Sequence, residues 1–202
     1  EQLLRLVQEK PGDARIHVFV ASYYRATNQL DRAAAEMAIA RELSPNKQAI
    51  IHQQGFVELA RGQNETANDF FKVAFELDER NPEAREYYAA SALYLNDINT
   101  ATALLDTEAT KNKFANSEFL LGAANQAGAN DLLIELFSYR LEADQSVAQN
   151  WATLAFLYYN QGDTQKAIEI LSDSQVAIPT FASTSNCIIG NIETGVDPQL
   201  GC

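Results

Sequence analysis

Hydrophobic residues recur at every third or fourth position between residues 148 and 179, with polar residues between them. This spacing predicts two amphipathic helices, because an α-helix has about 3.6 residues per turn. The hydrophobic face of the first helix consists of Trp151, Leu154, Ala155 and Tyr158, and that of the second of Ala167, Ile168 and Leu171. Gly162 allows the left-handed conformation of a tight turn between them. Pro179 stops the second helix, because it has no amide proton.

The spacing of these residues is characteristic enough to point to a known repeat. The pattern W-x2-L-A-x2-Y, followed by A-x3-L and a closing proline, resembles the tetratricopeptide repeat (TPR). Pro45 also falls 34 residues after Pro11, which is the period of this repeat class. The resemblance implies an all-α fold, a right-handed α-solenoid of TPR helix–turn–helix repeats with a C-terminal capping helix. The capping helix is expected at Phe181, Ile188, Ile189 and Ile192, which follow helical spacing.

The recurring turns and prolines divide the chain into one solenoid, residues 1–194, and a C-terminal tail, residues 195–202, that we expect to be extended. The expected parts of the solenoid are a half repeat at 1–11, repeats at about 14–45, 48–81, 82–114, 115–147 and 148–179, and a cap at 180–194. The half repeat would use Leu3, Leu4, Leu6 and Val7 as its apolar face. Because the chain opens inside a repeat, we expect it to be part of a longer array. The polar run 107–113 predicts a short or loosened helix end followed by a loop.

Composition excludes several classes of partner. The chain has 202 residues, of which 47% are hydrophobic, and a net charge of −12. Its 15 Lys and Arg are spread along the sequence, which disfavours nucleic acid and anionic membrane surfaces. No apolar run reaches the roughly 18 to 20 residues that a membrane-spanning helix needs, so we expect no direct membrane insertion by this chain. The composition therefore leaves proteins or peptides as the expected partners.

The sequence shows no arrangement that predicts catalysis, a cofactor or a metal ion. It has no phosphate-binding glycine loop, no HExxH or CxxC spacing and no nucleophile elbow. His17 stands where Trp151 stands in the last repeat, and we interpret it as a packing residue. Cys187 and Cys202 match no zinc pattern. We favour two free thiols here, with a disulfide that fixes the tail as the alternative.

In TPR proteins the first helices of the repeats line a concave face, and positions between the packing residues face its groove. By this register the resemblance implies a groove lined by Arg15, Ser22, Arg25, His52, Phe56, Glu86, Tyr94, Phe119, Gln126, Phe156, Tyr159 and Asn160. Aromatic and arginine side chains are common anchors in protein interfaces. Val18 and Ser22 occupy two positions of the carboxylate clamp that holds chaperone tails, so a chaperone-tail adaptor is not expected.

The leading hypothesis is a non-catalytic scaffold that binds a peptide or protein in its concave groove. One alternative is a structural spacer or self-assembly module, which would stack through the N-terminal half repeat.

A weaker resemblance suggests a third hypothesis. The segments SPNKQ from Ser44 and NPEAREYYAA from Asn81, with the Ile-rich cap, resemble the repeat domains of bacterial O-antigen-ligase-like membrane proteins. That resemblance implies a regulatory TPR domain of a bacterial envelope glycan ligase or polymerase. The sequence leaves open the partner, the organism and the compartment, whether cytoplasm or bacterial envelope.

Overall fold

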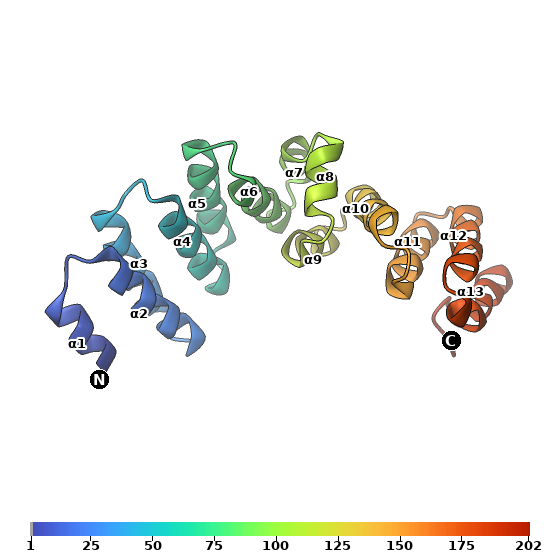
Figure 1. Ribbon diagram of the computed structural model, residues 1–202, viewed down its shortest axis with the longest axis horizontal. Helices are drawn as coiled ribbons and strands as arrows, with labels where there is room; N and C mark the ends of the chain where they lie inside the picture. The colour runs from blue at the N-terminus through green and yellow to red at the C-terminus, as the bar shows by residue number, and fades with distance from the viewer. Residues whose placement is uncertain (1) are drawn as a thin grey trace. The chain divides into compact units, whose positions relative to one another are not determined.

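The computed structural model describes residues 2–202, and this part of the chain contains thirteen α-helices, one short 3-10 helix and no strand (Figure 1). The chain forms two compact units, which meet in sequence at Leu104 and Leu105. The helices of the first unit are α1 (Gln2–Glu9), α2 (Ala14–Ala26), α3 (Leu30–Leu43), α4 (Gln48–Ala60), α5 (Asn64–Leu77), α6 (Pro82–Tyr94) and α7 (Ile98–Leu104). Those of the second are α8 (Glu108–Phe114), α9 (Glu118–Gln126), α10 (Asn130–Ala143), α11 (Ala148–Asn160), α12 (Thr164–Ala177), η1 (Pro179–Phe181) and α13 (Ala182–Thr194).

In the first unit each helix packs against the next one along the chain, from α1 to α7 (Figure 1). Helix α2 also contacts α4, so the first helices of two neighbouring pairs lie side by side. Fully buried alanines, Ala33 and Ala40 on α3, lie with Met37 in the core that α2, α3 and α4 share. The side chains of Leu3 and Leu4, expected in the half repeat, lie outside the described residues.

A residue with the left-handed backbone conformation (positive φ) lies between the two helices of every helix pair. These residues are Asn28, Gly62, Asn96, Gly128 and Gly162, at intervals of 34, 34, 32 and 34 positions. In each turn, the backbone amide of the residue that follows the left-handed one donates to the carbonyl five positions earlier, at 2.8 to 2.9 Å. The amide of Asp163, for example, donates to the carbonyl of Tyr158. This is the Schellman bond that closes a helix C-terminus. Glycine and asparagine tolerate the left-handed region best, so the predicted role of Gly162 is confirmed.

The polar run 107–113 was expected to be a short or loosened end of the preceding helix followed by a loop, and that prediction is wrong. Helix α7 ends at Leu104, and α8 is a separate helix with its own cap. The hydroxyl of Thr107 accepts the amide of Thr110 at 3.2 Å, and the hydroxyl of Thr110 accepts the amide of Thr107 at 3.3 Å. This reciprocal capping box starts a helix even in a polar segment. An ion pair of 2.6 Å from Lys111 to Glu135 then ties α8 to α10.

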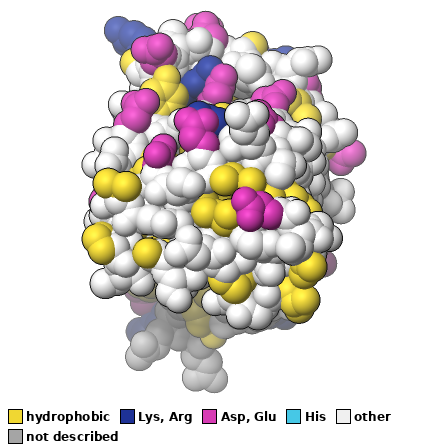
Figure 2. Space-filling model, turned by 90° about the vertical axis from the view of Figure 1, so that its right-hand side faces the viewer, with side chains coloured by type: hydrophobic (Ala, Val, Ile, Leu, Met, Phe, Trp, Pro, Cys, Tyr) yellow, Lys and Arg dark blue, Asp and Glu magenta, His cyan; other side chains and the backbone are white. Residues whose placement is uncertain are grey.

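Helix α13 caps the second unit. It packs against α12, where Ile188, Ile189 and Ile192 lie against the core that includes Trp151 and Leu171. Figure 2 faces the side on which Figure 1 draws α12 and α13, and hydrophobic side chains lie there in separate groups. Helix α13 thus covers the apolar face of α12 in the second unit.

The C-terminal tail folds back on α13 instead of extending. Cys187 of α13 and Cys202 form a disulfide, so the expectation of two free thiols is wrong. The side-chain amide of Asn191 donates to the carbonyl of Leu200 at 2.9 Å and to that of Pro198 at 3.3 Å. One turn of α13 brings Asn191 next to Cys187, which is four positions earlier, so both anchors act on the same segment.

A close approach between helices α4 and α5 makes one glycine sensitive to substitution. A Cβ added to Gly55 would lie 2.7 Å from Cζ of Phe71, whose side chain is fully buried. We expect Gly55→Ala to lower the free energy of unfolding by about 1 to 3 kcal/mol through overpacking, measured by chemical denaturation. The control is Gly122→Ala in α9, which meets no atom within 4 Å and should be neutral or stabilising by up to about 1 kcal/mol. Equal effects of the two substitutions would contradict this packing.

The disulfide gives a second prediction. Replacing Cys187 and Cys202 with serine removes the cross-link over a separation of 15 residues, and the loop-entropy estimate for that length is about 3 kcal/mol. We expect a lower melting temperature and faster proteolysis of the tail. A reducing agent should do the same to the wild type and leave the double serine variant unchanged. A wild type that is indifferent to reduction would argue against the cross-link.

Candidate functional site

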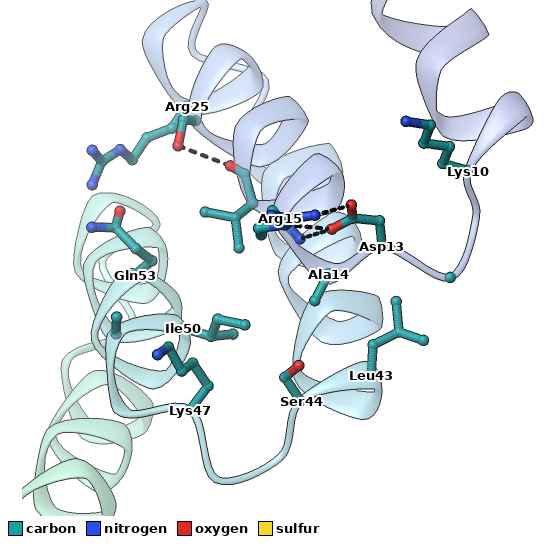
Figure 3. Close-up of a pocket in the computed structure, with 14 residues that line it drawn as sticks. Lys10, Asp13, Ala14, Arg15, Arg25, Leu43, Ser44, Lys47, Ile50 and Gln53 are labelled. Carbon is teal, nitrogen blue, oxygen red and sulfur yellow. Dashed lines mark hydrogen bonds and ion pairs between the residues drawn. The ribbon is translucent and has the colours of Figure 1, made fainter.

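A groove lies between α2 and α4 in the first unit and is drawn in Figure 3. Its volume is about 1170 Å³. The loop before α2, the face of α2, the end of α3 and the start of α4 form its walls, through Lys10, Gly12, Asp13, Ala14, Arg15, Val18, Ser22, Arg25, Leu43, Ser44, Lys47, Ala49, Ile50 and Gln53. It contains three of the expected groove residues, Arg15, Ser22 and Arg25.

Helix α2 supplies the first wall, and its register explains which side chains reach the groove. Arg15, Val18, Ser22 and Arg25 are three or four positions apart, so they share one face of the helix. Asp13 is the N-cap, and its carboxylate accepts the amide of Arg15 at 3.0 Å. The hydroxyl of Ser22 donates to the carbonyl of Val18 at 2.9 Å, which leaves its oxygen as an acceptor toward the groove.

The opposite wall combines apolar and polar groups. Ile50 and Gln53 lie one turn apart on α4, and Lys47 stands at the N-cap of that helix. Leu43 and Ser44 come from the end of α3 (Figure 3). Among the residues that the structure describes, Lys47 forms no ion pair and Gln53 no side-chain hydrogen bond. Both side chains are therefore available to a ligand.

Asp13 and Arg15 form an ion pair at the edge of the groove (Figure 3). Nη2 of Arg15 lies 2.8 Å from Oδ2 of Asp13, and Nε lies 3.0 Å from Oδ1. The side-chain hydrogen bonds from Arg15, and then its backbone amide, lower the pKa of Asp13 to about 2. Asp13 is thus ionised at neutral pH. Because Arg15 is largely exposed, this pair adds little to stability, but it places one carboxylate within the groove.

His17 fixes the loop that carries Lys10, Gly12 and Asp13. Its ring is buried; Nε2 lies 2.9 Å from the carbonyl oxygen of Pro11, and Nδ1 lies 2.7 Å from Oε2 of Glu36 on α3. Both partners accept hydrogen bonds, so the protonated ring, with two N–H groups, satisfies both. Burial acts to lower the pKa of His17, but the hydrogen bonds to Glu36 and Pro11 outweigh it, and the pKa is raised. The ring therefore links α2 to α3 and to the loop before α2.

His52 and Phe56 were expected to line the groove, but the structure places them in an aromatic cluster. His52 is only 5% exposed and meets the ring of Tyr87 edge-on, with 5.0 Å between centroids. Phe56 contacts Phe71 and Tyr87 in the same way, at 5.1 and 4.8 Å. Burial lowers the pKa of His52, which favours the neutral ring. We interpret these rings as part of the packing between α4, α5 and α6.

Four further residues of the implied groove lie on α6 and α9. Glu86 and Tyr94 are half-buried on α6, Phe119 is half-buried on α9, and Gln126 is exposed at the end of α9. None of these four lines the groove between α2 and α4. Their assignment to a binding surface stays a prediction.

Phe156 and Tyr159 on α11 stack on each other, with ring centroids 6.5 Å apart, and Asn160 is the exposed last residue of that helix. The two rings line a small apolar cavity of about 40 Å³. Pro198 and Gln199 of the C-terminal tail also line it, next to Ile188 and Ile192 of α13. The tail that the disulfide holds therefore covers this aromatic pair.

Sequence reasoning missed Lys10, Lys47 and Gln53 in the groove. The TPR register considers positions within the first helices, whereas Lys10 and Lys47 lie in the connections just before them. A local excess of basic residues in an acidic chain was the available signal. Within residues 2–202 no cluster of His, Cys, Asp and Glu side chains is arranged to hold a metal ion. Among the same residues, no helix is long and apolar enough to cross a membrane.

Comparison with known proteins identifies the fold. No model of a protein family matches the sequence, and no curated protein matches it either. Solved structures do. YrrB, described as a TPR protein with an unusual peptide-binding site, is 18% identical with a TM-score of 0.60, over 89% of this chain and 93% of that one. MamA is 16% identical with a TM-score of 0.65, over 84% of this chain and 94% of that one. PilF of Pseudomonas aeruginosa is 14% identical with a TM-score of 0.59, over 90% and 83%.

At these identities the likeness establishes the fold alone. The chain has the all-α TPR fold, which confirms the predicted fold class. The weaker resemblance to O-antigen-ligase-like proteins stays a prediction, and so does the division of the chain into repeats with the stated boundaries.

The buried histidine predicts a specific dependence of stability on pH. Because the pKa of His17 is raised on folding, its contribution is complete below the unfolded value of about 6.5 and is lost as the pH rises through the folded value. The difference in unfolding free energy between wild type and His17→Gln should therefore shrink as the pH rises from about 6.5 through the pKa of His17 in the folded protein. The expected loss at low pH is about 1 to 3 kcal/mol. Denaturation curves across this pH range measure it, and a difference that grows with pH would contradict the charged pair.

Proposed function

We propose that this TPR-fold chain is a non-catalytic scaffold that binds a peptide or protein segment in the groove between α2 and α4. One observation carries the proposal. The groove has about 1170 Å³ and is built from the aligned faces of two first helices, with Arg15, Ser22 and Arg25 directed at it. Cavities of this size accommodate a short peptide segment or a small ligand.

The side chains in the groove support binding rather than catalysis. Its lining combines apolar side chains, including Val18 and Ile50, with charged and amide groups that can fix the orientation of a ligand. Its lining contains no histidine or cysteine, and the hydroxyl of Ser22 donates to the carbonyl of its own helix. A nucleophile would need an adjacent base. YrrB, which shares the fold, is described as having a peptide-binding site, and this supports the same class of ligand here.

The groove between α2 and α4 is a better candidate for the binding surface than the aromatic residues that the TPR register implied. His52 is buried and Phe56 packs against the rings of Phe71 and Tyr87, while Pro198 and Gln199 of the tail line the same cavity as Phe156 and Tyr159. Substituting those rings would disturb packing as well as any contact with a partner. Exposed residues in the groove between α2 and α4 allow a cleaner test, because their side chains can be changed without opening a cavity.

The test is a selection of peptides from a random display library, followed by affinity measurement on two variants. Ser22→Trp fills the groove from an exposed position on α2, and we expect it to weaken selected peptides at least about tenfold by steric exclusion. Ala35→Trp adds the same ring at an exposed position of α3 outside the groove and should bind like the wild type. Circular dichroism confirms that both fold. The proposal fails if no peptide is selected, or if both variants bind equally well.

A further inference from the structure

The groove between α2 and α4 carries a charge opposite to that of the rest of the chain. Four basic side chains line it, from Lys10, Arg15, Arg25 and Lys47, against one acidic side chain, Asp13. Outside the groove the chain has 11 Lys and Arg against 26 Asp and Glu. Because the groove has a net positive charge, its electrostatic field raises the local concentration of negatively charged ligands there. The acidic surroundings would repel an acidic partner everywhere else.

The cations have few partners within the protein. Among the described residues Lys10, Arg25 and Lys47 form no ion pair, and only Arg15 is paired, with Asp13. Arg25 and Gln53 lie across from each other at one end of the groove, and Arg15 lies further along α2 (Figure 3). Guanidinium groups recognise carboxylates through paired hydrogen bonds.

We propose that the groove binds an extended, acidic peptide segment in which two carboxylate side chains, four to five positions apart, flank small apolar residues. This inference rests on the proposed function and specifies its partner. The carboxylates pair with the cations along the walls, and the apolar residues contact the apolar part of the lining, which consists of Ala14, Val18, Leu43, Ala49 and Ile50.

The length of the walls sets the spacing of the carboxylates. Arg15 and Arg25 are ten positions apart on α2, which corresponds to about 15 Å at about 1.5 Å per residue. An extended chain advances about 3.3 Å per residue, so the same distance spans four to five residues, about 15 Å in total. A helical segment would need about ten residues for it. The amide of Gln53 and the oxygen of Ser22 can then pair with the exposed backbone groups of the extended segment.

Asp13 shows how a carboxylate sits in this groove and also limits the affinity of the site. It pairs with Arg15 through both carboxylate oxygens, at 3.0 and 2.8 Å, in the geometry that an acidic ligand would adopt. A ligand carboxylate must therefore share Arg15 with Asp13 and approach a like charge. Removing the charge of Asp13 should strengthen binding, which is an effect that simple damage to the fold would not produce.

The experiment uses the full chain and three fluorescent hexapeptides. The first is acetylated and amidated, with two glutamates four positions apart and alanine, valine and alanine between them. The second replaces the glutamates with glutamine. The third keeps glutamine and has a free C-terminal carboxylate. Anisotropy titrations give the affinities, and we expect the first peptide to bind about tenfold or more tightly than the other two. Its affinity should fall steeply toward about 1 M salt, where the Debye length is about 3 Å.

Three variants test the residues. Arg25→Gln combined with Lys47→Gln removes two unpaired cations and should weaken the first peptide about tenfold. Asp13→Asn keeps an N-cap of similar quality and should strengthen it about two- to fivefold. Lys72→Gln, an exposed position of α5 outside the groove, removes the same charge as either cation substitution and should change affinity less than about twofold. Melting curves confirm that all variants fold.

The outcomes separate this inference from the proposed function. If library peptides bind in the groove but the glutamine peptide binds as tightly as the glutamate peptide, the scaffold stands and the acidic partner is wrong. Tighter binding of the peptide with the free terminus would likewise overturn it in favour of a terminal carboxylate. If Asp13→Asn weakens binding in a folded protein, the proposed sharing of Arg15 is wrong. If no peptide of any class binds, the proposed function fails as well.

Discussion

The close approach of paired helices is the constraint on which the rest of the structure depends. Ala33, Ala67, Ala101 and Ala167 stand early in second helices and are fully buried. A larger side chain at these positions would hold the two backbones apart, because interior packing leaves no spare volume. Each close contact then needs a tight reversal of the chain. The left-handed residue before every second helix provides it.

The groove follows from this pairing. When second helices pack against first helices at a fixed distance, the first helices α2 and α4 are brought side by side, as their direct contact shows. Their outward faces then form two walls of one groove. The side chains that the packing does not use, such as Ser22 and Arg25, are left on those walls. The pairing of helices therefore decides which residues a partner can reach.

The sequence identified the helix pairs well because their signals are local. The stripe from Trp151 to Tyr158 and the turn at Gly162 lie within one repeat, and helical spacing reveals them directly. It was less successful where the signal was weak. The run 107–113 lacks apolar residues, so only the capping box of Thr107 and Thr110 distinguishes its helix from a loop. The candidate site was harder still, because the register alone does not show which side chains pack together. Arg15, Ser22 and Arg25 line the groove between α2 and α4, whereas His52 and Phe56 lie in an aromatic cluster.

By itself the sequence determined the fold class, because the positions of alanine, glycine and apolar residues specify paired helices through local geometry and packing. Only the tertiary structure decided which side chains share a cavity. Lys10, Arg25 and Lys47 come from two connections and a helix, and nothing in their spacing along the chain indicates that they line one groove. Nor could spacing decide between free thiols and a disulfide. That depended on the tail turning back on α13, which brings Cys202 to Cys187.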